Sequence, residues 1–86
     1  MSKKGKLVER FLKDPPVTDF RWTELVKLMR GFDFELDDSA GGSHCFFFHP
    51  INESWIIHTH RPHPGGILWD KQIRQIRARL TEWGVL

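Results

Sequence analysis

Histidines carry most of the chemistry that this sequence could perform, because imidazole gains and loses a proton near neutral pH. His44 follows a Gly-Gly-Ser run in GGSHCFFFHP (residues 41–50), and three more histidines lie in HTHRPH (residues 58–63). General acid–base catalysis, as in the cleavage of a phosphodiester, needs a group that takes a proton from the attacking hydroxyl or gives one to the departing oxygen, and imidazole, with a reference pKa of ~6.5, can do either. His44 is therefore a candidate general acid or base. The alternative is a structural or merely exposed histidine at the start of a strand.

The residues next to His44 favour a site that accepts a sugar-phosphate backbone. Gly41 and Gly42 can turn the chain with positive φ and allow a close approach. Ser43 could orient the imidazole or contact a phosphate. Cys45 is offset by one position and points to the opposite face of a strand, so it is a poor nucleophilic partner for His44 and is expected to fill the core.

The second histidine group has a spacing similar to the zinc-binding HxHxDH motif, with His58, His60 and His63 in the three histidine positions. Pro62 stands where the motif has its aspartate, and a chain of 86 residues is too short for the further ligands of such a hydrolase. The sequence therefore predicts no metal cofactor. His63 is a candidate supporting RNA contact or a simple turn residue, and His49 is expected to end its strand.

Charge is distributed unevenly although the net charge is only +2. Residues 1–31 hold eight Lys/Arg and four Asp/Glu, residues 32–54 hold five acids and no Lys or Arg, and residues 55–86 hold five bases and two acids. The basic ends are either solvated faces or a surface that attracts phosphate where they meet. The candidates for electrostatic contacts to phosphate are Arg61 and, on the last helix, Lys71, Arg74, Arg77 and Arg79.

Length and composition limit the setting of any site. A chain of 86 residues forms one domain with a single core, and its seven Phe and four Trp supply apolar area for that core. The single cysteine excludes an internal disulfide. Since no apolar run approaches 18 residues and the N-terminal residues lack a hydrophobic signal segment, we expect a cytoplasmic protein without a membrane anchor.

Periodicity predicts the order helix, helix, strand, strand, strand, helix. A helical arm over residues 3–13 is ended by Asp14-Pro15-Pro16, and a second helix over residues 21–30 has Thr18 or Asp19 as a possible cap and Gly31 at its end. Strands are expected at residues 32–36, 44–48 and 55–60. The last helix has Asp70 and Gly84 as its expected caps. Its apolar stripe, expected to lie in the core, is Trp69, Ile73, Ile76, Leu80 and Trp83.

These elements predict an α+β fold, a two-layer sandwich with a three-stranded antiparallel sheet and helices on one face. The middle strand puts His44, Phe46 and Phe48 on one face and Cys45, Phe47 and His49 on the other. Because helices cover only one face, aromatic surface remains on the other face for a partner, a nucleic acid or the N-terminal arm.

The stretches FRWTELVKLMRGFDFEL, GSHCFFFHP and WIIHTHRPHPGG, with the closing WGVL, resemble the HicA family of bacterial toxins. The resemblance covers about residues 20–86 and leaves residues 1–19 as a helical arm. It implies the fold of a double-stranded-RNA-binding domain and a metal-independent endoribonuclease, an mRNA interferase, with His44 of the Gly42-Ser43-His44 element as catalytic residue. It also implies an mRNA substrate and a HicB-type antitoxin. The alternative is a module of the same fold that binds RNA or protein and cleaves nothing.

The resemblance and the sheet together predict where the antitoxin binds. A small domain with no lid has no evident means of restraining its own activity, and an open sheet edge can accept another chain. We therefore expect the antitoxin to cover residues 42–48 and to block access to His44.

Overall fold

The structure is a computed structural model that describes residues 3–62 and 66–86. The described part of the chain contains three helices and a three-stranded sheet, in the predicted order. The elements are α1 (Lys3–Phe11), α2 (Trp22–Gly31), β1 (Glu35–Asp37), β2 (His44–Phe48), β3 (Ile56–His60) and α3 (Asp70–Glu82).

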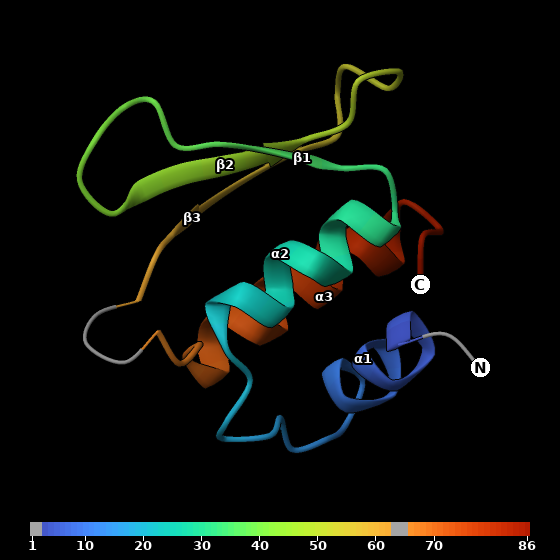
Figure 1. Cartoon of the computed structure of the whole chain (residues 1–86). Coiled ribbons are helices and arrows are strands. Elements are labelled where there is room, and N and C mark those ends of the chain that lie inside the picture. The colour runs from blue at the N-terminus through green and yellow to red at the C-terminus, as the bar shows by residue number, and fades with distance from the viewer. Residues whose placement is uncertain (1–2, 63–65) are drawn as a thin grey trace.

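The sheet is an antiparallel meander with the strand order β1-β2-β3. In its register His44 pairs with His60, Phe46 with His58, and Asp37 with Phe46. Figure 1 shows the helices on one side of this sheet and open space on the other. The predicted two-layer α+β fold is therefore confirmed.

The core lies between the sheet and the helices. Strand alternation sends Cys45 and Phe47 of β2 toward the helices, where they are 2% and 0% exposed, while His44 is exposed. The residues that meet these side chains come from every helix and from the chain before β1, among them Phe11, Leu25, Phe34, Ile73 and Leu80. Cys45 is thus a core residue, as predicted.

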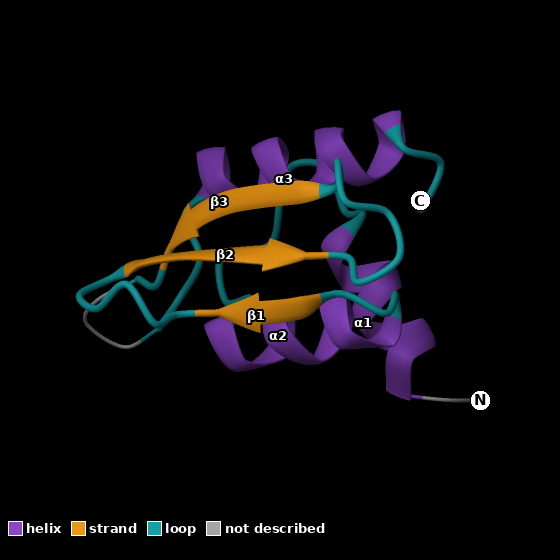
Figure 2. Ribbon diagram, turned by 90° about the horizontal axis from the view of Figure 1, so that it is seen from above, coloured by secondary structure: helices purple, strands orange, loops and turns teal. Residues whose placement is uncertain are grey.

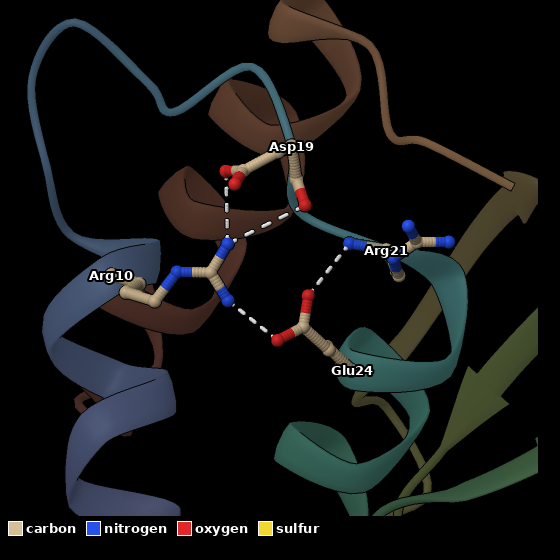
Figure 3. A network of polar contacts seen from close by, with 4 residues as sticks. All are labelled: Arg10, Asp19, Arg21 and Glu24. Atoms are coloured by element: carbon tan, nitrogen blue, oxygen red, sulfur yellow. Dashed lines mark hydrogen bonds and ion pairs between the residues drawn. The ribbon is translucent and has the colours of Figure 1, made fainter.

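Helix α1 packs against this same core. Leu7 and Phe11 are buried, and the Phe11 ring lies 5.3 Å from the ring of Phe20. Arg10 fixes the orientation of α1, since its guanidinium pairs with Asp19 at 3.0 Å and with Glu24 at 2.5 Å (Figure 3). The predicted helical arm therefore contributes both apolar and polar contacts to the folded domain.

The start of α2 differs from its prediction. Neither Thr18 nor Asp19 caps the helix: Arg21 is the N-cap residue, and its N–H donates to the carboxylate of Glu24 at 3.0 Å (Figure 3). The Asp19 side chain is instead held by Arg10.

The start of α3 also differs from its prediction, which has Asp70 as the cap. Trp69 is its N-cap residue, and Asp70 is the first residue of the helix. Gly84 ends α3 as predicted, because it adopts φ of +75°, and Val85 N–H then donates to the carbonyl of Leu80 at 2.8 Å.

Candidate functional site

Three imidazoles lie together on the open face of the sheet. His44 begins β2, and the register puts His60 of β3 directly across from it and His58 two positions before His60 in β3. The ring centroid of His44 is 5.2 Å from that of His60 and 5.6 Å from that of His58. All three residues are exposed. We call these residues, His44, His58 and His60, the histidine cluster.

The loop before β2 leads directly into the histidine cluster, because His44 follows it in the chain. Gly41 and Gly42 adopt φ of +83° and +62°, so the predicted left-handed turn is confirmed, and an added Cβ would be strained there. Arg61 ties the loop down: its N–H donates to the carbonyl of Ser43 at 2.7 Å, and its guanidinium pairs with Asp38 at 2.7 Å. The loop is therefore held at both ends by one residue that follows β3.

The other end of the open face is aromatic and acidic. Phe46 lies 6.0 Å from Phe48 and 5.4 Å from His58 between ring centroids. A hollow of about 380 Å³ is lined there by both phenylalanines together with Asp37 and Glu53. Ser39 donates from its hydroxyl and its N–H to Asp37, which lowers the pKa of that carboxyl and keeps it charged. This end is suited to apolar and cationic groups rather than to phosphate.

Two other titratable residues of β2 and its turn face inward. The Nδ1 atom of His49 accepts hydrogen bonds from the N–H groups of Ile51 and Asn52, at 3.2 and 3.1 Å, and so builds the turn after the strand. Burial raises the pKa of the Cys45 thiol and keeps it protonated. Neither residue belongs to the histidine cluster.

The basic side chains of α3 that are predicted to contact RNA lie in two different places. Lys71 is exposed and shares a hollow with His58 and His60. Arg74 pairs with Asp70 at 2.5 Å and with Asp14 at 3.5 Å, while Arg77 donates to the carbonyl of Lys13 at 3.1 Å. The structure therefore brings Lys71 to the histidine cluster and turns Arg74 and Arg77 toward the chain that follows α1.

Sequence reasoning missed three residues that contribute to this region. His58 and His60 were considered only for their metal-like spacing, whereas strand register places them beside His44; counting residues back from the turn between β2 and β3 could have shown this. Trp69 was assigned to the core, but 55% of its surface is exposed and it lines the hollow with Lys71. The prediction that Trp83 packs against the core agrees more closely with the structure, since the Trp83 ring stacks on that of Trp55 with 5.4 Å between centroids.

The predicted RNA contact His63 lies outside the described residues. Within the described ranges, no group of three or more His, Cys, Asp or Glu side chains is arranged to hold a metal ion. No helix in the described part of the chain is long and apolar enough to cross a membrane.

A helix, a three-stranded meander and a closing helix, with an exposed histidine at the start of the middle strand, define a small two-layer α+β domain. The family model described as the HicA toxin of bacterial toxin–antitoxin systems matches residues 22–84. The chain therefore belongs to the HicA family and is a toxin of a toxin–antitoxin system, a class that acts together with an antitoxin. It has no significant match among curated proteins or among solved structures.

Proposed function

We propose that this toxin is a metal-independent endoribonuclease that cleaves mRNA, with His44 as its catalytic residue. The observation that carries the proposal is the exposed histidine cluster beside a glycine turn, on a sheet face that the helices leave open. Family membership supports a toxin, and the cluster supports acid–base chemistry as the way in which it acts.

Two neighbouring imidazoles suit the cleavage of RNA without a metal. In this reaction the ribose 2′-oxygen attacks phosphorus, the bond to the 5′-oxygen breaks, and a 2′,3′-cyclic phosphate forms. A neutral imidazole takes the proton of the 2′-OH, and a protonated imidazole gives one to the departing 5′-oxygen. In this proposal His44 takes one role and His60 takes the other, and the distance of 5.2 Å between their ring centroids supports that pairing.

The supporting residues have distinct parts in this proposal. Gly42 and Ser43 admit the sugar-phosphate backbone beside His44, and Arg61 holds their loop through Asp38. Lys71 supplies positive charge next to His60. RNA contact by Arg74 and Arg77 remains a prediction, and it requires these side chains to leave Asp14 and the carbonyl of Lys13. RNA contact by His63 also remains a prediction.

The test compares His44→Ala with the unaltered protein in cleavage of a labelled mRNA fragment. We expect a loss of about 10²–10⁴ in rate, the usual contribution of one acid–base group. Thr23→Ala, at an exposed position on α2, serves as the control and should cleave normally. EDTA should leave cleavage unchanged. Undiminished cleavage by His44→Ala would refute the assignment, and binding without cleavage by the unaltered protein would favour the alternative of a non-catalytic binding module.

We infer further that a HicB-type antitoxin covers the open face over residues 42–48. The aromatic and acidic hollow beside Phe46 and Phe48 offers apolar contact and two carboxylates to a protein partner. An interface of ~1,200–2,000 Å² would be needed for a stable complex. Such a cover would also block access to His44, which restrains the enzyme without any change in its fold.

Hydrogen exchange of the complex and of the free toxin tests this cover. Added protection of β2 and β3 in the complex, with α2 unaffected, is the expected pattern. If the antitoxin inhibits cleavage while β2 and β3 gain no protection, inhibition acts from elsewhere on the domain.

A further inference from the structure

β3 is an edge strand of the sheet, and α3 lies beside it (Figure 2). A groove between them is lined by residues of both elements. It consists of two adjoining hollows of about 460 and 240 Å³, which share His58, Thr59 and Gln75 as lining residues. One hollow extends toward Arg79 and the other toward Trp69 and Lys71. We call this surface the β3–α3 groove; His58 belongs both to it and to the histidine cluster.

The lining of the β3–α3 groove is suited to an anionic ligand with flat apolar parts. Lys71 stands at one end and Arg79 at the other, with His58 between them. No carboxylate occurs among the lining residues that the structure describes, but Arg79 is paired with Glu82 at 3.0 Å, so Lys71 is the lining cation that carries the argument for phosphate. Trp69 exposes 55% of its surface there, although an indole of this size is usually buried in a small domain. Exposed aromatic rings next to cations are the pattern by which proteins hold single-stranded nucleic acid.

Trp69 is held in place by a buried amide. The Trp69 N–H donates to Gln72 Oε1 at 3.3 Å, and Gln72 Nε2 donates to Thr59 Oγ1 and to the carbonyl of His60, each at 2.7 Å. Gln72 is only 6% exposed, so these bonds are shielded from water. The backbone of Trp69 is therefore fixed relative to β3 before any ligand arrives, which reduces the entropy cost of binding.

The same amide makes the groove a poor acceptor for an added peptide strand. Strand addition relies on outward-facing backbone groups along a free edge. Here the carbonyl of His60 already has its partner in Gln72. Because the cations of the groove also favour phosphate, its chemistry fits a nucleic acid better than a protein strand.

We propose that the β3–α3 groove binds single-stranded RNA, with one base stacked on Trp69, a phosphate beside Lys71, and the amide of Gln75 hydrogen-bonded to a base edge. This inference rests on the proposed ribonuclease function and specifies how its substrate is held. The strand passes from the groove across His58 to His44 and His60, since His58 lines the groove and its ring lies 5.6 Å from that of His44.

The experiment measures binding separately from cleavage. The probe is an eight-nucleotide fluorescein-labelled RNA of mixed sequence with 2′-O-methyl groups throughout, which lacks the attacking 2′-OH. Fluorescence anisotropy gives its Kd for the unaltered toxin, for Trp69→Ala, for Trp69→Phe and for the control Ile51→Ala, an 87% exposed apolar residue in the turn after β2. We expect Trp69→Ala to bind roughly 5- to 150-fold more weakly, as loss of one base–aromatic stack does. Trp69→Phe should retain most of the affinity, and Ile51→Ala all of it.

Two results would overturn the inference. One is an unaltered toxin that binds the probe while Trp69→Ala binds it equally well; the other is an unaltered toxin that cleaves unmodified RNA but whose Trp69→Ala variant cleaves it with unchanged KM. A different pattern would favour a protein occupant instead: the antitoxin, but not RNA, protects the backbone amides on either side of Trp69 from hydrogen exchange. If instead the probe binds as expected but His44→Ala cleaves normally, the catalytic assignment fails and the groove stands.

Discussion

Both faces of the sheet carry aromatic residues, but the environments of these residues differ. On the inner face Phe47 is fully buried, and its ring lies 5.7 Å from that of Trp22. On the outer face Phe46 is half-buried and contacts a neighbouring phenylalanine and an imidazole. Adjacent positions of one strand thus lie in the core and on the open surface, and the difference arises from alternation alone.

The largest expected effect comes from removing a ring on the inner face. Phe47→Ala should reduce the free energy of unfolding by about 3–5 kcal/mol, because it leaves a cavity in a close-packed core. Phe46→Ala, one position away, should cost no more than about 1 kcal/mol, the order of a cross-strand side-chain contact. Urea denaturation followed by circular dichroism measures both. Equal losses in the two variants would mean that the outer face is also part of the core.

A smaller effect is expected where the two layers are joined by polar groups. Gln72→Leu removes the amide that serves Trp69, Thr59 and His60, and leaves their polar groups without these partners. The expected loss of stability is ~1–3 kcal/mol. Gln75→Ala on the same helix is the matched control: Gln75 is exposed, and its replacement should change stability by about 0.5 kcal/mol or less.

The Gln72 variant also connects stability to the proposed groove. If Gln72 positions Trp69, Gln72→Leu should weaken binding of the 2′-O-methyl RNA at a temperature where the variant remains folded. A variant that loses stability but keeps the full RNA affinity would show that Trp69 needs no support from the amide.

The sequence predicted the inner face well because burial follows from simple periodicity. The alternation of β2 placed Cys45 and Phe47 inside, and the spacing of Ile73, Ile76 and Leu80 identified the buried side of α3. Trp69 has the same spacing but lies at the N-cap, where the chain leaves the helical path, so the stripe does not govern its side chain. Periodicity therefore fails at the N-terminus of α3, where Trp69 lines the proposed groove.

The outer face was harder to predict, because its composition depends on register between strands. His44 was identified from its neighbours in the sequence, but its proximity to His58 and His60 follows from pairing across a turn of seven residues between β2 and β3. Long-range ion pairs were equally hidden: Asp14 draws Arg74 away from the proposed RNA side, and Asp19 meets Arg10 instead of capping α2. Ion pairs between residues far apart in the sequence depend on the tertiary structure, so sequence patterns do not predict them.

The smallest expected effect concerns pH and a residue next to the histidine cluster in sequence. Burial raises the pKa of Cys45, so the folded protein keeps the thiol proton at pH values where the unfolded chain, with a thiol pKa of ~8.5, loses it. The contribution to stability is fully present below the unfolded pKa and decreases as the pH rises toward the folded one, by at most ~1.4 kcal/mol per pH unit. The stability advantage of the unaltered protein over Cys45→Ala should thus be constant up to about pH 8 and shrink above it, because other titrations cancel in the difference. Urea titrations of both proteins at a series of pH values measure this. An advantage that stays constant up to pH 10 would indicate that the Cys45 thiol ionises as easily in the folded domain as in the unfolded chain. The inner face around Cys45 would then be accessible to water.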